Sequence, residues 1–175
     1  MLTIAVSKIK NIPGAKADID LCADVDPLAY GYQDLEFSSP VHFIGEMGNK
    51  NGLIFVSGRA SAGMKFCCHR CGEPFTKDIQ ALVEAYYTLQ PEKADPQGEY
   101  DIFTYSGETI DITPEVLRQI FLEVPMKLLC REDCRGLCPI CGANLNYNKC
   151  SCRVEQIDPR LEKLKDFVFD TEKGV

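Results

Sequence analysis

Six cysteines gather in the 23 residues of CREDCRGLCPICGANLNYNKCSC (130–152), and CHRC at 68–71 adds two more. Thiolates are both strong zinc ligands and redox groups. The chain has ten cysteines, and a disulfide framework of that size is typical of secreted proteins. Its first residues, MLTIAVSKIKNIPGAK, lack the basic leader, long apolar stretch and cleavage site of a secretory signal. We therefore expect a cytoplasmic protein whose clustered thiols bind metal.

The spacing of the cysteines favours zinc. The pattern C-x-x-C-G occurs at 68–72 and again at 138–142. It brings two sulfurs to about 2.3 Å from one ion, and the glycine lets backbone amides turn toward the sulfurs. The remaining pairs are spaced C-x-x-x-C and C-x-C. The sequence predicts two zinc ions, held by Cys68, Cys71, Cys130, Cys134, Cys138, Cys141, Cys150 and Cys152.

Two partitions of these ligands are open. In the first, the four cysteines of 138–152 surround one ion, because closing so short a loop costs little entropy. The C-x-x-C at 68–71 would then meet Cys130 and Cys134 and hold the cysteine-rich segment against the preceding domain. In the second, the two C-x-x-C-G motifs share one ion. We favour the first partition.

The predicted sites are closed and structural. A catalytic zinc keeps one position open for water and usually has histidine or carboxylate ligands, whereas four-cysteine sets are saturated. The spacings fit zinc better than iron–sulfur clusters, and the C-x-x-C motifs lack the βαβ context of thiol oxidoreductases. Phosphate loops, nucleophile elbows and dinucleotide fingerprints are missing from the sequence. We therefore expect neither catalysis nor a small-molecule substrate.

Four other side chains of ligand type are not expected to bind metal. Cys22 and Cys67 have no companion at ligand spacing, and a lone cysteine usually behaves as a small buried apolar residue. His42 lies inside a strand pattern, and His69 is expected to be an exposed residue of the first motif.

Most elements that must position the thiols are expected to be strands. Residues 75–89 alternate apolar and polar side chains, as in a long half-buried strand. The stretches PVHFIGEM and GLIFVSGRASAGMKFCC flank GNKNG, which predicts a hairpin. DLEFSS is expected to lead into it. YDIFTY and TIDI flank SGE and predict a second strand–turn–strand unit.

A helix is expected to follow these strands. Thr113 suits the N-cap and Pro114 the first helical position, and Pro125 ends the pattern. Its apolar stripe is Val116, Leu117, Ile120, Phe121 and Val124. The same pattern at Asp158-Pro159, with Leu161, Leu164 and Val168, predicts a short terminal helix.

The expected fold class is therefore α+β. It is a mainly antiparallel β-sheet, able to curl like a barrel, with one helix after the last strands. Residues 1–129 would form this β-rich domain. Residues 130–175 would form a cysteine-rich, zinc-binding appendix and the terminal helix, packed on the first domain. No run of 18 apolar residues predicts a membrane span.

The chain resembles the YceD family of large ribosomal RNA subunit accumulation proteins. The resemblance rests on CCHRCGEPF, on ETIDITPEVLRQIFLEVPMKLLC, and on the cysteine-rich segment followed by IDPRLEKLKDF. It implies a non-catalytic role in the accumulation of large-subunit (23S) ribosomal RNA and in ribosome assembly. In that family the later cysteines look optional, whereas the earlier pair, here Cys68 and Cys71, is more general.

Three hypotheses for the function remain open. The net charge is −7, which disfavours nucleic acid, but the acidity is concentrated in 83–125, where nine acidic residues accompany two basic ones. In the first hypothesis a zinc-stabilised surface binds rRNA precursor or a ribosomal protein bound to it. In the second, the acidic middle docks on a basic ribosomal protein without touching RNA. In the third, the thiols release zinc on oxidation and act as a sensor. Candidate RNA contacts are Arg59, Lys65, Arg70, Lys77, Arg135, Lys149 and Arg153.

Overall fold

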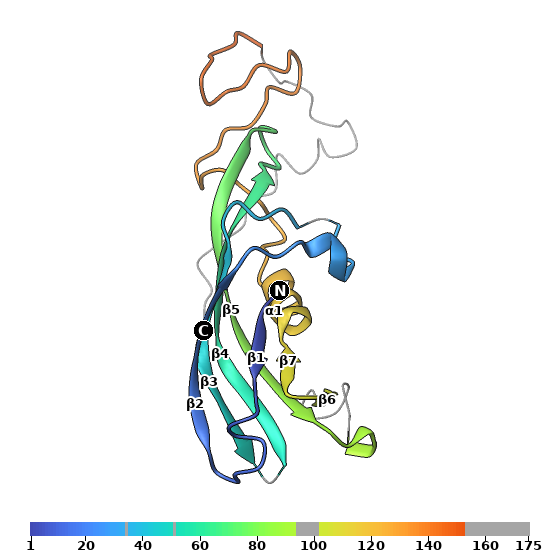
Figure 1. Cartoon of the computed structure of the whole chain (residues 1–175). Coiled ribbons are helices and arrows are strands. Elements are labelled where there is room, and N and C mark those ends of the chain that lie inside the picture. The colour runs from blue at the N-terminus through green and yellow to red at the C-terminus, as the bar shows by residue number, and fades with distance from the viewer. Residues whose placement is uncertain (34, 51, 94–101, 153–175) are drawn as a thin grey trace, which may run out of the picture.

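The computed structural model describes residues 1–33, 35–50, 52–93 and 102–152. Its main sheet has five strands in the order β2-β3-β4-β5-β6, and β1 and β7 form a separate two-stranded sheet. Figure 1 shows the main sheet curling around helix α1. The bounds are β1 Thr3–Ala5, β2 Lys16–Ala23, η1 Pro27–Tyr30, β3 Val41–Lys50, β4 Leu53–Cys67, β5 Pro74–Thr88, η2 Pro91–Lys93, β6 Ile102–Thr104, β7 Thr109–Asp111 and α1 Thr113–Leu122.

The two longest strands, β4 and β5, form one antiparallel hairpin that runs the length of the sheet. Their register pairs Ile54 with Tyr87 at one end and Cys67 with Pro74 at the other. The alternation predicted for 75–89 is confirmed, because every second residue of β5 from Ile79 to Tyr87 is buried. The alternation fails at its end, where Thr88 is buried and Leu89 lies beyond the strand and is exposed. The hairpin carries the first C-x-x-C-G motif at its tip.

The predicted hairpin of β3 and β4 is also present, and two opposed glycines let it bend. Gly45 pairs with Gly58 in register. A Cβ at Gly58 would lie 2.4 Å from the Ile44 carbonyl oxygen, and one at Gly45 would lie 2.2 Å from that of Ser57. Glycine in a strand interior often marks such a close approach of two backbones. This contact accompanies the curl of the sheet seen in Figure 1.

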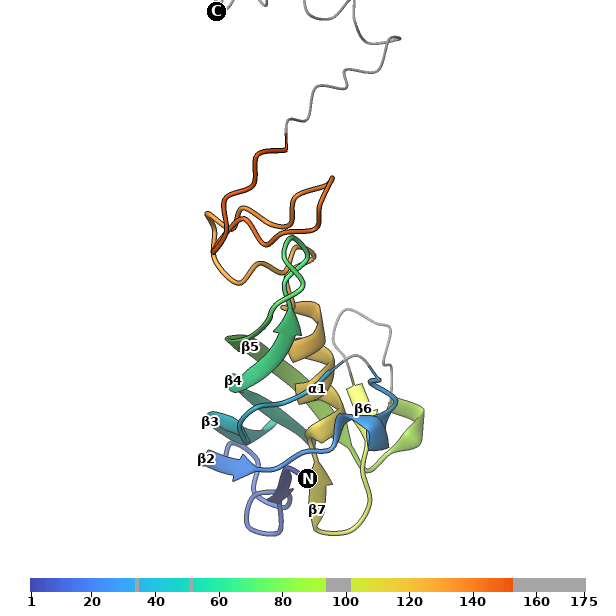
Figure 2. The same ribbon diagram turned by 90° about the horizontal axis from the view of Figure 1, so that it is seen from above.

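One face of the curled sheet forms the core together with α1, β1 and β7. Figure 2 shows α1 lying across the strands. Val116, Leu117 and Ile120 of the helix are fully buried against the sheet. Phe121, which was predicted to belong to the same stripe, is instead exposed and contacts the Tyr32 ring at 5.6 Å between centroids.

The start of α1 differs from the prediction. Thr113 is the first helical residue, and Ile112 occupies the cap position without a side-chain hydrogen bond. The Thr113 hydroxyl oxygen accepts from the Leu2 backbone N–H at 2.7 Å. Asp111 Oδ1 accepts from the Thr113 backbone N–H at 3.0 Å. Asp111 thus provides the side-chain oxygen that was expected from a capping residue. Thr113 therefore ties the N-terminal strand to the helix.

The second predicted strand–turn–strand unit contains both of its strands, β6 and β7, but they do not pair with each other. β6 pairs in parallel with β5, and β7 pairs antiparallel with β1, so the two strands belong to different sheets. The described residues of DLEFSS, 35–39, lie just before β3, and Phe37 forms an isolated bridge with Met64. Strands β1 and β2 were not predicted.

The predicted fold class is confirmed: the structure is mainly an antiparallel, half-barrel sheet with one helix after the strands and cysteine clusters near the C-terminal end. The terminal helix predicted from residue 158 lies outside the described residues. Within the described part of the chain, every helix is too short to span a membrane.

Candidate metal centres

The first thiol cluster joins parts of the chain that lie about 60 residues apart. Cys68 and Cys71 come from the tip of the β4–β5 hairpin, and Cys130 and Cys134 follow α1. The sulfurs of Cys68 and Cys134 lie 3.7 Å apart, and those of Cys71 and Cys130 lie 3.8 Å apart. Four sulfurs at about 2.3 Å from a tetrahedral ion are separated by about 3.8 Å. The donor set therefore fits a four-coordinate metal ion.

Backbone hydrogen bonds shape the hairpin tip that carries this cluster. The Cys68 N–H donates to the Glu73 carbonyl at 2.9 Å, and the Gly72 N–H donates to the Cys68 carbonyl at 2.8 Å. Gly72 has φ 73°, a left-handed conformation that glycine adopts without steric cost. The His69 N–H donates to the Leu128 carbonyl at 2.8 Å, which aligns the segment after α1 with the tip.

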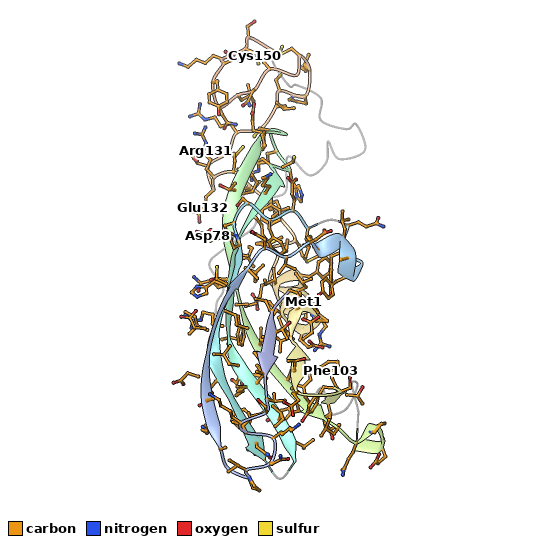
Figure 3. The ribbon with its side chains drawn as sticks, viewed as in Figure 1. Met1, Asp78, Phe103, Arg131, Glu132 and Cys150 are labelled. Atoms are coloured by element: carbon orange, nitrogen blue, oxygen red, sulfur yellow. The ribbon has the colours of Figure 1, made fainter. Side chains whose placement is uncertain are left out.

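The second cluster repeats this turn within one short segment. The Cys138 N–H donates to the Ala143 carbonyl at 2.8 Å, and the Gly142 N–H donates to the Cys138 carbonyl at 2.9 Å. Cys150 and Cys152 close the set, and the four sulfurs lie within 4.8 Å of one another. Figure 3 places Cys150 at the far end of the molecule from Phe103. The second cluster is thus more distant from the sheet core than the first.

The two clusters differ in exposure. Cys68, Cys71 and Cys134 of the first are buried, and Cys130 is half-buried. In the second only Cys138 is buried, whereas Cys141 is exposed and the other two are half-buried. Solvent and competing ligands therefore reach the second cluster more easily.

Each cluster contains thiols whose pKa is lowered and thiols whose pKa is raised. Burial opposes ionisation of Cys68, but the backbone N–H groups around it outweigh burial and lower its pKa to about 6. Backbone N–H groups of Cys141 and Ile140 lower the pKa of Cys138 to about 6. Burial raises the pKa of Cys130 to about 12. A hydrogen bond with the Cys141 thiol raises the pKa of Cys152 to about 12. A bound cation deprotonates such ligands, because only thiolates coordinate.

The structure thus groups the eight thiols as in the first partition, and the two C-x-x-C-G motifs belong to different clusters. Both clusters can hold a metal ion. Cys22 and Cys67 lie in neither cluster, and both are exposed, so the expectation that they are buried is wrong. His42 pairs with Asp20 at 2.7 Å, and His69 is exposed as expected.

The basic residues proposed as RNA contacts fall into two groups. Two are engaged: Lys65 forms an ion pair with Glu36 at 2.6 Å, and Arg70 Nη1 donates to the Cys134 carbonyl at 2.7 Å. Others are exposed without a side-chain partner in the described residues, namely Arg59, Lys77, Arg135 and Lys149. Arg153 lies outside the described residues.

Sequence reasoning missed one residue of the first cluster's surroundings. The Asn146 side-chain amide donates to Cys134 Sγ at 3.4 Å. Asn144 donates to Glu73 at 3.3 Å and accepts from Asn146. The available signal was the repeated asparagine in NLNYN, since asparagine readily bonds to nearby backbone groups.

The fold and the site define the class of protein: a curled, mainly antiparallel sheet with one helix and two clusters of four cysteines, the first of which joins the β4–β5 hairpin tip to the segment after α1. The chain belongs to the YceD family: the family described as "Large ribosomal RNA subunit accumulation protein YceD" matches residues 56–168, which include all eight clustered cysteines.

Three relatives illustrate the range of similarity. An uncharacterized protein of Mycobacterium tuberculosis, Rv2926c, is 33% identical over 69% of this chain and 60% of its own length. The uncharacterized protein YlbN of Bacillus subtilis is 26% identical over 97% of this chain and 98% of its own length. The "Large ribosomal RNA subunit accumulation protein YCED homolog 1, chloroplastic" of Zea mays is 25% identical over 68% of this chain and 50% of its own length.

The chain therefore spans about 60% of the length of the mycobacterial relatives that it matches. A search of solved structures gave no significant match.

Proposed function

We propose that both clusters hold zinc, as closed structural ions. Four sulfurs per ion leave no position for a reacting water, so the ions would stabilise a surface and carry no reaction. Cys68, Cys71, Cys130 and Cys134 would hold the first ion, and Cys138, Cys141, Cys150 and Cys152 the second. In this proposal residues 1–129 form a β-rich domain and residues 130–175 a zinc-binding appendix. The first ion would fasten the appendix to the domain.

The protein would act in the cytoplasm as a non-enzymatic factor for the accumulation of large-subunit (23S) ribosomal RNA and for ribosome assembly. Membership of the YceD family and the names of the plant relatives support this role. The observation that carries the mechanism is the first cluster, because it joins the hairpin tip to the segment after α1 and so fixes the two surfaces beside it.

The fixed surface would bind rRNA precursor, or a ribosomal protein bound to that RNA, through exposed arginine and lysine side chains. The hairpin tip and the cysteine-rich segment, 64–78 and 126–152, contain seven basic and four acidic side chains. Arg135 and Lys149 are exposed there without ion pairs in the described part of the chain. Such side chains contact phosphates without reading sequence.

The acidic-adaptor hypothesis receives less support, because internal contacts occupy several of its carboxylates. Glu115 is buried and accepts from the Tyr87 hydroxyl at 2.9 Å. Glu108 pairs with Lys10 at 2.8 Å, and Asp111 accepts from the Tyr30 hydroxyl at 3.1 Å. A basic partner would therefore have to compete with internal contacts for three of the nine acidic side chains of 83–125.

Charge reversal and RNase treatment together test the proposal. The double variant Arg135→Glu with Lys149→Glu should lose binding to large-subunit rRNA in a filter-binding titration, and wild-type binding should weaken steeply with salt. The matched control, Lys8→Glu with Lys50→Glu, changes the same charge at exposed positions away from the clusters and should bind as wild type does. Affinity that is flat in salt, or a ribosomal protein that co-purifies unchanged after RNase, would favour the adaptor.

A further inference from the structure

Asn146 links the two thiol clusters. It lies in the segment between Cys141 and Cys150, which are both ligand candidates of the second cluster. Its side-chain amide nevertheless donates to the sulfur of Cys134, which belongs to the first cluster, at 3.4 Å. The loop that one cluster closes therefore supplies a hydrogen-bond donor to the other.

A set of hydrogen bonds fixes the orientation of this amide. Asn146 Oδ1 accepts from the Arg135 backbone N–H and from Arg131 Nη2, each at 2.8 Å. Its Nδ2 donates to Asn144 Oδ1 at 2.9 Å in addition to the sulfur. Both ends of the side chain are thus held between the segment that leads into Cys134 and the loop of the second cluster.

Backbone contacts bring the same two segments together. The Leu145 N–H donates to the Gly136 carbonyl at 2.9 Å, and the Leu137 N–H donates to the Arg70 carbonyl at 3.1 Å. A Cβ at Gly136 would lie 2.9 Å from the Arg70 carbonyl oxygen. Residues 135–137 therefore lie between the hairpin tip and the Asn146 loop, so that a displacement of that loop reaches the first cluster directly.

We propose that Asn146 couples the two metal sites, so that an ion in the second cluster raises the affinity of the first. The proposal rests on the proposed binding of zinc by both clusters. An ion held by Cys138, Cys141, Cys150 and Cys152 closes the loop that carries Asn146. The loop then holds the amide N–H against the Cys134 thiolate. An N–H donor to a ligating sulfur disperses part of the charge that four thiolates place on one ion, and outer-shell donors of this kind contribute about 10–100-fold to metal affinity.

Coupling between two binding sites is reciprocal. An ion in the first cluster fixes Cys134, and Cys134 in turn holds Asn146 and the loop of the second cluster. The chain would therefore pass from the metal-free to the two-ion form with little of the one-ion form. Asn146 is a positioning residue in this scheme and not a ligand.

Native mass spectrometry in zinc buffered by a chelator tests the coupling. Wild type should show metal-free and two-ion species with little one-ion species at intermediate zinc. In Asn146→Asp the one-ion species should accumulate, because this variant keeps an oxygen for Arg131 and Arg135 but replaces the N–H donor with a carboxylate oxygen. The apparent affinity of its first cluster should fall about 10–100-fold.

Two further variants keep the test sharp. The double variant Cys150→Ser with Cys152→Ser removes the second site. Its first cluster should bind an ion as weakly as the first cluster of Asn146→Asp does. Asn148→Ala is the matched control, since Asn148 is exposed in the same loop without a side-chain bond in the described residues, and it should titrate as wild type does.

Three results would overturn the coupling. One is a one-ion species that accumulates equally in wild type and in Asn146→Asp. Another is a first cluster whose affinity is unchanged when the second is removed. Both leave zinc binding itself intact, whereas a wild-type chain that takes up no zinc would refute the proposed function together with the coupling.

Discussion

The sulfurs of Cys71 and Cys130 lie 3.8 Å apart although 58 residues separate them in the sequence. β4, β5 and α1 bring them together: the hairpin ends where Cys68 begins the turn, and the chain returns to that tip after the helix. An ion bound there would fasten one end of the sheet to the cysteine-rich segment.

The second cluster should release its ion to a chelator before the first. Cys141 is exposed, whereas three of the four thiols in the first cluster are buried, so a competing ligand reaches the second ion more easily. A colorimetric chelator added to the zinc-loaded protein should show two kinetic phases. Cys150→Ser with Cys152→Ser should release its one remaining ion in a single phase. A single phase in wild type would contradict the difference in exposure, and a hydroperoxide in place of the chelator would show whether the thiols also sense oxidants.

Zinc binding should release about two to three protons per ion near pH 7.5, because some ligands are already ionised. In the first cluster the pKa of Cys68 is lowered to about 6, whereas those of Cys71 and Cys130 are raised. In the second cluster the pKa of Cys138 is lowered to about 6, and those of Cys150 and Cys152 are raised. Calorimetric titration in two buffers of different ionisation enthalpy counts the protons.

The pH dependence of binding has a definite sign. Binding needs thiolates, so the affinity falls as the pH falls, and it falls more steeply below about pH 6, where Cys68 and Cys138 also become protonated. Release of four protons per ion at pH 7.5 would show that no thiol is ionised before the metal binds.

Replacing Gly58 with valine should destabilise the sheet. The added Cβ would lie 2.4 Å from the Ile44 carbonyl oxygen and 2.7 Å from the Phe43 ring. Forcing atoms into a packed site costs on the order of 1–3 kcal/mol. Urea denaturation measures the loss, and Ser57→Ala, at the neighbouring position of β4, is the matched control. Equal midpoints for Gly58→Val and wild type would mean that the close approach of β3 and β4 is unimportant.

Glu115→Gln should stabilise the protein at neutral pH. Burial raises the pKa of Glu115, although its own backbone N–H and the Tyr87 hydroxyl oppose this shift. A carboxyl whose pKa is higher in the folded than in the unfolded protein supports folding fully at pH values below the unfolded pKa. This support is lost as the pH rises through the folded pKa.

Wild type should therefore gain stability on acidification from pH 7 toward pH 5, and Glu115→Gln should lose part of that gain. Urea denaturation at both pH values measures it. Glu123→Gln, an exposed position at the end of the same helix, is the control. A pH dependence unchanged by Glu115→Gln would show that the buried carboxyl titrates normally.

How far the sequence predicts this molecule depends on how local each signal is. The alternation of β5 and the positive φ of Gly52 between β3 and β4 follow from local signals, and the structure contains both. Spacing favoured Cys138, Cys141, Cys150 and Cys152 as one set, with the other four grouped by elimination, but it left open a site shared by the two C-x-x-C-G motifs. The structure groups the thiols as in the favoured partition.

The missed features depend on contacts between distant residues. A three-residue strand such as β6 carries no sign of whether it will pair in parallel with β5 or form a hairpin with β7. Likewise, the asparagines of NLNYN indicate local hydrogen bonds but not that Asn146 reaches the sulfur of Cys134. Strand β2 is different, since the alternation of KADIDLCA is itself a local strand signal.

The most direct test of the central claim is metal analysis of the purified protein. Wild type and the control Cys67→Ser, an exposed thiol outside both clusters, should each contain about two zinc ions per chain, and Cys130→Ser and Cys150→Ser about one each. Fewer than two ions in wild type, or two ions retained in Cys130→Ser, would contradict the claim that thiols from the hairpin tip and from the segment after α1 bind one shared ion.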